Sequence, residues 1–226
     1  MGSGAMFDAI ADRYDLLNRI NSLGLDRRWR RLTVNSLHIE ARHRCLDLAT
    51  GTGDMVLAID EAQPGVSCVG LDPSARMLDV ARRKLARAGV GARLVEGDAQ
   101  ALPFEDGSFD RATMAFGIRN IPDRGKALSE LARVLAPGGR AAILELAEPE
   151  GRLARFHVHA VVPRIGALLS MKAEYDYLPA SIAAFPKPEA FAQTMTSAGL
   201  PVRRIERLAF GACALFVAGV DKGSAA

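Results

Sequence analysis

The stretch RCLDLATGTGD, residues 44–54, decides the fold. Its first half is a short apolar run typical of a buried strand, and its two glycines, Gly51 and Gly53, mark a turn into a helix. Glycines at such a turn let a ligand approach the backbone closely, and ligands of α/β sheets bind at the carboxyl ends of the strands. A dinucleotide-binding fingerprint needs a third small residue at position 56, which is Val56. The pattern therefore predicts a ligand site after the first strand without identifying the ligand.

Short apolar runs continue beyond this stretch and alternate with helical segments. The expected strands are residues 44–49, 66–71, 92–96, 109–116 and 140–146. The expected helices between them are residues 54–64, residues 75–88 with Ser74 as N-cap, and residues 124–135 closed by Pro137, Gly138 and Gly139. Strands that alternate with helices through short turns form a parallel sheet covered on both faces. Two last strands, residues 202–208 and 212–220, predict an antiparallel hairpin.

Both ends of the chain read as helical. Residues 1–40 contain one apolar stripe and then a helix at residues 26–37, in which Trp29 is an apolar anchor. The stripe consists of Phe7, Ile10, Ala11, Tyr14 and Leu17. The alternation of strands and helices ends after Pro149, where an apolar helical stretch at residues 153–171 precedes a helix at residues 188–198.

Acidic residues follow the second and third predicted strands. Asp72 ends the second strand, where a carboxylate can accept hydrogen bonds from two ribose hydroxyls. Asp98 follows the third strand, where a carboxylate can accept from an adenine amino group. The alternative is that both are ordinary turn-forming aspartates. The glycine turn, Asp72 and Asp98 each follow a strand end, and this agreement weighs against that alternative. The predicted ligand has a ribose and an adenine but no bound pyrophosphate, which favours S-adenosylmethionine over NAD.

The composition excludes several classes of protein. The chain has 226 residues, 49% of them hydrophobic and 24% charged, which is typical of a soluble globular domain. A net charge of +3 is well below that of most nucleic-acid binders, so we expect no nucleic-acid partner. Three cysteines without CxxC spacing and four histidines without HExxH spacing predict neither a disulfide framework nor a metal site. With no signal peptide apparent, we expect a cytoplasmic protein.

Four segments resemble the successive motifs of class I S-adenosylmethionine-dependent methyltransferases. They are DLATGTGD (47–54), GLDPSARML (70–78), EGDAQALPFEDGSFD (96–110) and RVLAPGGR (133–140). The resemblance implies S-adenosyl-L-methionine as methyl donor, S-adenosyl-L-homocysteine as product and no metal. The residues that it assigns to the cofactor are Tyr14, Asp47, Thr50, Gly51, Thr52, Gly53, Asp72, Pro73, Met77, Asp98, Ala99 and Phe116.

A second set of segments is similar to the ubiquinone/menaquinone biosynthesis C-methyltransferase family. These are FDAIADRYDLLNRINSLGLDRRWRR (7–31), FGIRN (116–120), PRIG (163–166), YDYLPASI (175–182) and FP (185–186). The resemblance covers almost the whole chain, from Phe7 to about Phe216. Two positions depart from the family pattern. Leu17 stands where methionine is more frequent, and Ala115 stands where a serine often contacts the cofactor, so Ala115 has no assigned contact.

The family resemblance implies C-methylation of a prenylated quinol, such as demethylmenaquinol to menaquinol or a ubiquinol precursor. It places Arg119 and Asn120 on the acceptor side, and we expect Arg119 to stabilise the quinol oxyanion, directly or through water. His159, His157 and Tyr177 are candidates to take the quinol proton, although either histidine can equally be an ordinary surface or core residue. Two alternatives stay open: methylation of another small phenol or secondary metabolite, and a non-catalytic S-adenosylmethionine-binding partner subunit.

The resemblance also implies an architecture. We expect a single α/β domain with a Rossmann-like, seven-stranded class I methyltransferase sheet, mostly parallel with an antiparallel C-terminal hairpin. Its parts are N-terminal helices (1–40), a cofactor-binding half (44–148), a helical acceptor cap (152–188) and the hairpin (200–220).

A lipophilic quinol substrate implies a channel for its tail and peripheral contact with the inner face of the cell membrane. Residues 153–171 and 185–191 are candidates to line the channel, with core packing as the alternative. The arginines within residues 27–31, together with Trp29, are a candidate membrane contact, with composition and solvated helix faces as the alternative. The head group, the tail length and the oligomeric state stay open.

Overall fold

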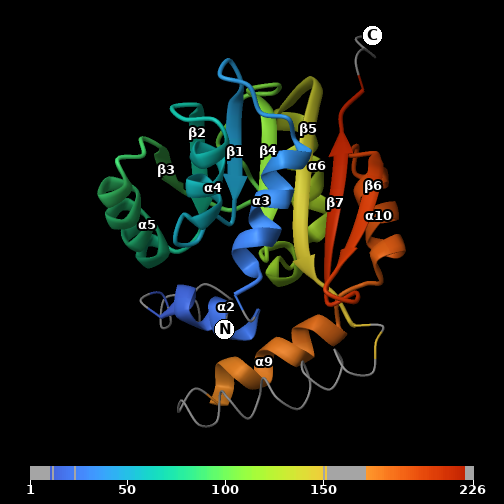
Figure 1. The fold of residues 1–226 in the computed structure, drawn as a ribbon. Coiled ribbons are helices and arrows are strands. Elements are labelled where there is room, and N and C mark those ends of the chain that lie inside the picture. Colours follow the sequence, from blue (N-terminus) through green and yellow to red (C-terminus); the bar gives the residue numbers. More distant parts are fainter. Residues whose placement is uncertain (1–10, 12, 23, 150, 152–171, 222–226) are drawn as a thin grey trace.

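A seven-stranded sheet forms the centre of the structure, a computed structural model that describes residues 11, 13–22, 24–149, 151 and 172–221 (Figure 1). The strands are β1 (Arg44–Leu48), β2 (Ser67–Asp72), β3 (Arg93–Glu96), β4 (Phe109–Ala115), β5 (Leu135–Leu146), β6 (Val202–Leu208) and β7 (Cys213–Gly219). Their order is β3-β2-β1-β4-β5-β7-β6. The first five run parallel and β7 is antiparallel to β5 and β6, which confirms the expected fold class. Because β1 pairs with both β2 and β4, the glycine turn after β1 lies where the strand order reverses, the usual ligand position in this architecture.

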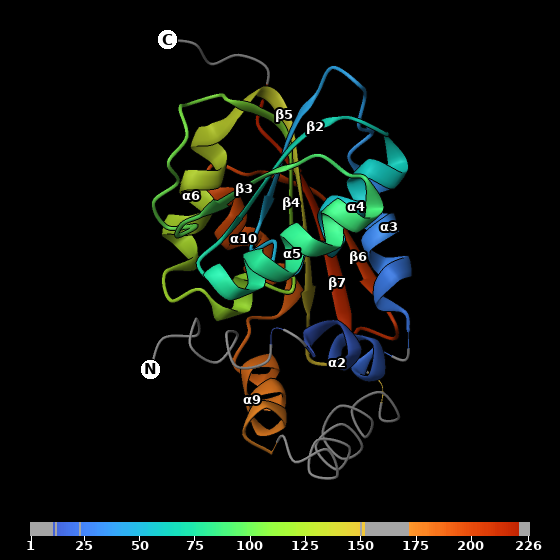
Figure 2. The same cartoon turned by 90° about the vertical axis from the view of Figure 1, so that its left-hand side faces the viewer.

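Helices cover both faces of the sheet. They are α2 (Tyr14–Asn21), α3 (Asp26–Ser36), α4 (Asp54–Ala62), α5 (Ala75–Ala88), α6 (Arg124–Val134), α9 (Lys172–Ala183) and α10 (Pro188–Ser197), with a short 3-10 helix η1 (Ile118–Asn120) after β4. α6 and α10 pack on one face, and α3 and α4 pack on the other (Figure 2). α2 and α9 lie beyond the carboxyl ends of the parallel strands (Figure 1). The ligand site expected at these strand ends is therefore bordered by elements from both ends of the chain.

Local capping explains where two of the helices begin. The Ser74 side chain accepts a hydrogen bond from the Met77 backbone N–H at 3.0 Å, which confirms Ser74 as the N-cap of α5. Asp123 caps α6 in the same way, accepting from the Lys126 N–H at 2.9 Å.

One predicted boundary is wrong. α6 ends at Val134 and β5 begins at once with Leu135, whereas the sequence predicted a turn at residues 137–139 and a strand from residue 140. Leu135 is buried and pairs with Phe109, so the chain already joins β4 before the glycines. The extra residues are taken up by an irregularity in the register between Phe109 and Arg111 of β4.

Aromatic residues of the C-terminal half belong to the core. Phe191 is fully buried, with its ring centroid 4.9 Å from that of Phe185 and 5.0 Å from that of Phe216. For Phe185 and Phe191 the structure shows the core packing that was the alternative to a channel. The other proposed channel segment, residues 153–171, lies outside the described residues.

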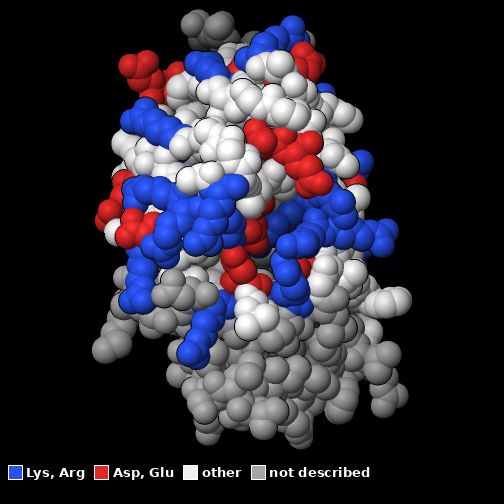
Figure 3. Space-filling model, turned by 60° about the vertical axis from the view of Figure 1, so that its left-hand side comes forward, with Lys and Arg blue, Asp and Glu red and all other residues white. Residues whose placement is uncertain are grey.

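Trp29 is part of the core, as its position as an apolar anchor of the helix predicts. It is 7% exposed, and its ring centroid lies 6.5 Å from that of Phe116. Arg27, Arg28 and Arg31 are exposed on the same helix, and Figure 3 shows basic side chains gathered over α3 and α5 on this side of the molecule. Within the described part of the chain, no helix is both long and apolar enough to cross a bilayer.

Candidate active site

The glycine turn after β1 is tied to the end of β2. Asp72 Oδ2 accepts a hydrogen bond from the Gly51 N–H at 2.8 Å, and its Oδ1 accepts from the Ser74 N–H at 2.9 Å. Gly51 has φ +54° and Gly53, which precedes α4, has φ +85°, a region in which side chains are strained. Asp72 is buried, at 7% exposure, and its carboxylate borders the turn through these two hydrogen bonds. The structure thus brings together three of the residues that the sequence assigned to the cofactor.

Asp47 supports this turn from inside the protein. Its carboxylate is fully buried and accepts hydrogen bonds from Thr50 Oγ1 at 2.6 Å and from Thr113 Oγ1 at 2.7 Å. Burial raises the pKa of Asp47 to about 6, while the two threonine hydrogen bonds act in the opposite direction. The structure therefore places Asp47 behind the turn, where it positions Thr50. Thr113, which faces Asp47 in the β1–β4 pairing, was not expected from the sequence.

Helix α2 lies against the same turn. A Cβ atom built on Gly51 would lie 3.9 Å from Tyr14 Cε1, so the Tyr14 ring borders the turn. The next residue, Asp15, accepts a hydrogen bond from Thr52 Oγ1 at 2.5 Å and pairs with Lys84 of α5. Lys84 Nζ also lies 2.6 Å from Asp54 Oδ1 and 3.0 Å from Thr52 Oγ1. These four side chains, called here the Lys84 cluster, connect α2, the glycine turn, α4 and α5.

The sequence carries no clear signal for the Lys84 cluster. Lys84 reads as one more basic residue on the solvated face of an amphipathic helix, and Asp15 as one more acid in the first turn of α2. Only the folded chain brings them together.

The remaining residues assigned to the cofactor follow β2 and β3. Met77 and Ala99 are buried, and Pro73 is exposed. Asp98 is exposed just after β3, and its Oδ1 accepts from the Gln100 N–H at 2.9 Å. These positions lie beside Asp72 along the carboxyl edge of the sheet, because β3 pairs in parallel with β2.

Two residues that are not glycine have positive φ at neighbouring strand ends. Ala49 after β1 has φ +51° and Phe116 after β4 has φ +60°. Each such residue costs about 1–3 kcal/mol and persists only where its surroundings hold it in place. The backbone N–H of Phe116 donates to Leu144 O at 2.8 Å, which fixes the end of β4 against β5. Strained backbone on both sides of the glycine turn is typical of a functional site.

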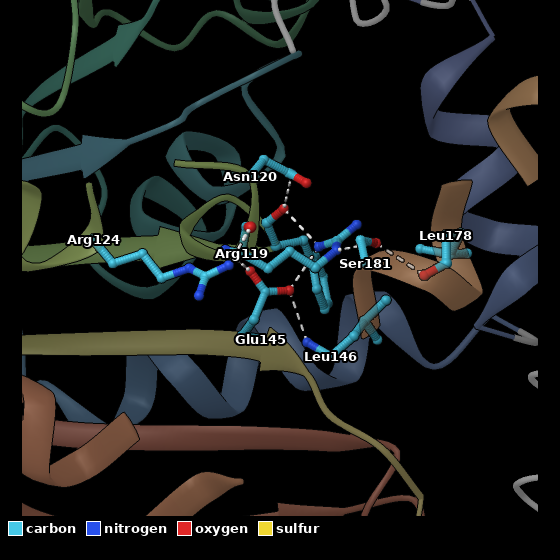
Figure 4. A network of polar contacts seen from close by, with 8 residues as sticks. Arg119, Asn120, Arg124, Glu145, Leu146, Leu178 and Ser181 are labelled. Atoms are coloured by element: carbon cyan, nitrogen blue, oxygen red, sulfur yellow. Dashed lines mark hydrogen bonds and ion pairs between the residues drawn. The ribbon is translucent and has the colours of Figure 1, made fainter. Parts of the chain in front are cut away.

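Arg119 is held by a buried ion pair (Figure 4). Its Nη1 lies 2.6 Å from Glu145 Oε1, with the two side chains 8% and 0% exposed, and also donates to Phe116 O at 2.9 Å. Its Nε donates to Ser181 Oγ of α9 at 3.4 Å. From the sequence, Arg119 is expected to supply the cation that stabilises the quinol oxyanion. In the structure, Glu145 already neutralises this guanidinium. The sequence carries a signal for Glu145, an acid inside the otherwise apolar end of β5.

The other acceptor-side residues are placed only in part. Asn120 Nδ2 donates to Phe116 O at 3.4 Å. Tyr177 belongs to α9, the helix that also carries Ser181, but its side chain lies outside the described residues, as do His157 and His159. Within the described part of the chain, no group of three His, Cys, Asp or Glu residues could hold a metal ion.

The strand order, the glycine turn at its reversal point and the acid at the end of β2 define a class I S-adenosylmethionine-dependent methyltransferase. Residues 3–220 match the ubiE/COQ5 methyltransferase family, and the chain belongs to that family.

Curated relatives of this family are similar over nearly the whole chain. A demethylmenaquinone methyltransferase of Thermus thermophilus is 50% identical over 94% of this chain and 98% of its own length. One of Deinococcus radiodurans is 46% identical over 94% of this chain and 90% of its own length. A ubiquinone/menaquinone biosynthesis C-methyltransferase UbiE of Geobacter sulfurreducens is 46% identical over 86% of this chain and 78% of its own length.

Solved structures share the fold at low identity. The [4+2]-cyclase SpnF superposes with a TM-score of 0.73 at 16% identity, covering 98% of this chain and 96% of that one. An S-adenosylmethionine-dependent methyltransferase of Aquifex aeolicus gives 0.66 at 18% identity, covering 84% and 89%. At these identities the likeness concerns the fold alone.

Proposed function

We propose that this methyltransferase moves a methyl group from S-adenosylmethionine to a ring carbon of a prenylated quinol, with demethylmenaquinol as the favoured acceptor. The observation that carries the proposal is the 50% identity with the Thermus thermophilus demethylmenaquinone methyltransferase over 94% of this chain. A second demethylmenaquinone methyltransferase at 46% identity supports the naphthoquinol over the benzoquinol head group.

The residues at the carboxyl edge of the sheet fit S-adenosylmethionine, which supplies a methyl group on a positively charged sulfur. A Cβ atom built on Gly51 would meet nothing closer than Tyr14 Cε1 at 3.9 Å, so the backbone there is open to close approach by a ligand. Asp72 at the end of β2 accepts hydrogen bonds from the backbone N–H groups of Gly51 and Ser74, and we assign its carboxylate to the ribose hydroxyls. Asp98 lies one strand further, where we assign it to the adenine amino group.

On the acceptor side, we assign to Arg119 a positioning role. Its pair with Glu145 and its contact with Ser181 join the ends of β4 and β5 to α9. This junction would hold the quinol ring in line with the methyl group and keep water out, which are large contributions to a group-transfer rate. In this proposal residues 44–148 hold the cofactor and residues 152–188 cover the acceptor, with Asn120, Tyr177 and His159 as candidates to contact its oxygens or take its proton.

A lipophilic acceptor implies work at the cytoplasmic face of a membrane. The exposed arginines Arg27, Arg28 and Arg31 on α3 are the charges that we assign to anionic head groups. Flotation with vesicles that contain anionic lipid should recover the wild type, and substitution of all three by glutamine should reduce recovery. Equal partitioning of the two proteins would remove the membrane role.

Labelled S-adenosylmethionine tests the whole proposal. The protein is incubated with demethylmenaquinol, a demethoxyubiquinol-type benzoquinol or a simple phenol, and the variant Asp72→Ala serves as a control with impaired cofactor binding. We expect label in the naphthoquinol and little in the other two. Label in the phenol alone would favour another small metabolite. Binding of S-adenosylmethionine without label in any acceptor would favour a non-catalytic partner subunit.

A further inference from the structure

Arg30 is a buried arginine whose Nε atom finds no hydrogen-bond partner among the residues that the structure describes. Its side chain comes from the middle of α3, and the residue is only 7% exposed. Its Nε atom has no hydrogen-bond partner, and its guanidinium forms no ion pair within the part of the chain that the structure describes. Buried charges in proteins are normally paired, because removing a charge from water without compensation is costly. An unpaired guanidinium in this position points to an anion that completes the site.

The surroundings of Arg30 place that anion near the end of β4. The guanidinium carbon lies 5.2 Å from the centre of the Phe116 ring, a cation–π distance. Trp29, the preceding residue, packs against the same ring. Phe116 carries the strained backbone that follows β4, so Arg30 lies above one wall of the candidate site.

Asp47 shows that Arg30 also lies close to the glycine turn. Burial raises the pKa of Asp47 to about 6, and the charge of Arg30 is near enough to oppose that rise. Asp47 itself holds Thr50 at the start of the turn. The cation therefore lies beside Phe116 at the end of β4, and its charge acts on Asp47 of β1.

The order of the strands indicates which part of the cofactor reaches Arg30. We have assigned the adenine to Asp98 after β3 and the ribose to Asp72 after β2. The remainder of S-adenosylmethionine then extends toward β1 and β4, and its terminal anion is the carboxylate of the amino-acid portion. A guanidinium matches a carboxylate through two parallel N–H···O bonds.

We propose that Arg30 binds the carboxylate of the amino-acid portion of the cofactor. The inference rests on the proposed function, because it takes S-adenosylmethionine as the ligand. It also explains why one arginine of α3 is buried while its neighbours Arg27, Arg28 and Arg31 are exposed. The cofactor carboxylate then neutralises the buried charge. Before the cofactor binds, the aromatic ring of Phe116 holds the guanidinium in place.

Calorimetric binding with two ligands tests the proposal. The ligands are S-adenosylhomocysteine and its decarboxylated analogue, and the variants are Arg30→Met and, as a matched control, the exposed Arg31→Met. For the wild type and Arg31→Met we expect the decarboxylated analogue to bind about 10–100-fold more weakly. Arg30→Met should lose a similar factor for S-adenosylhomocysteine and nothing for the analogue. Equal losses for both ligands, or none for either, would overturn the assignment.

Further measurements separate the possible failures. Wild-type protein that binds no S-adenosylhomocysteine would contradict the proposed function itself, whereas wild-type protein that binds both ligands equally would contradict only the role of Arg30. Thermal melting of the unliganded Arg30→Met protein should show no loss of stability, because the variant removes an unpaired buried charge. If it does not fold, Arg30→Lys should show partial loss for S-adenosylhomocysteine alone. Unchanged S-adenosylhomocysteine affinity with a raised KM for the quinol would assign Arg30 to the acceptor and overturn the proposal.

Discussion

Arg119 Nη1 and Glu145 Oε1 lie 2.6 Å apart at the carboxyl ends of β4 and β5, both closed off from solvent. Glu145 also accepts hydrogen bonds from the backbone N–H groups of Arg119 and Leu146, at 3.1 and 2.8 Å. Buried ion pairs contribute little net stability compared with apolar packing, but they fix geometry. The pair therefore determines how η1 and, through Ser181, α9 sit against the sheet.

Loss of Glu145 should be strongly destabilising. Glu145→Gln leaves the buried Arg119 guanidinium without its counter-charge, and we expect the free energy of unfolding to fall by about 3–5 kcal/mol. Urea denaturation measures the change. Asp79→Asn, which breaks the exposed Asp79–Arg82 pair, is the matched control and should change stability by about 0.5 kcal/mol or less. Equal effects of the two variants would mean that the buried pair is not held as described.

Replacing both partners separates stability from turnover. The double variant Arg119→Met/Glu145→Leu should recover most of the stability lost by Glu145→Gln, because apolar residues of similar size can replace a buried ion pair. Turnover should stay low, since the contact with Ser181 is gone, while the affinity for S-adenosylhomocysteine should remain near that of the wild type. A double variant with normal turnover would show that the pair has only a structural role.

The Lys84 cluster should make cofactor affinity dependent on salt. Lys84→Met removes the cation that joins Asp15 of α2 to Asp54 of α4, so we expect the Kd for S-adenosylhomocysteine to rise about 3–10-fold. Lys84 is 22% exposed, so salt screens these pairs in part, and the wild-type Kd should rise with ionic strength more steeply than that of the variant. Arg82→Met, on the exposed side of the same helix, is the control. An identical salt dependence for all three proteins would show that the Lys84 cluster does not contribute to cofactor affinity.

Asp47 should give stability a particular pH dependence. Its pKa rises from 3.8 to about 6 on folding, so between these values the folded protein binds a proton that the unfolded chain has lost. The free energy of unfolding contributed by Asp47 therefore falls as pH rises from about 4 to 6, by up to about 3 kcal/mol. Asp47→Asn removes this fall; its Oδ1 can accept from one of the two threonines, and its amide group can donate to the hydroxyl of the other. The wild-type minus variant difference, followed by denaturation at several pH values, should decline through this window and be flat above pH 7.

Local patterns in the sequence predicted the strands of the sheet. They did not predict which side chains from distant segments contact one another. The apolar runs located each strand, although β5 begins at Leu135 and not at residue 140, and Ser74 was identified as a cap, because both features depend on neighbouring residues. Arg30 was grouped with the other arginines of residues 27–31, because a helix sequence with many arginines does not reveal which of them faces the sheet. Lys84 finds Asp15 through tertiary contact between distant segments, which no periodicity encodes.

Gly117 is required for space and not for its backbone conformation. Its φ is −104°, which any residue can adopt, but a Cβ atom built on it would lie only 2.5 Å from Ala49 Cβ. Ala49 has the strained backbone after β1, so Gly117→Ala must push the glycine turn and η1 apart. We expect the free energy of unfolding to fall by about 1–3 kcal/mol, and both cofactor affinity and turnover to drop together. Gly91→Ala, where nothing lies within 4 Å, should change none of the three, and the same result for both variants would mean that the two strand ends are not in close contact.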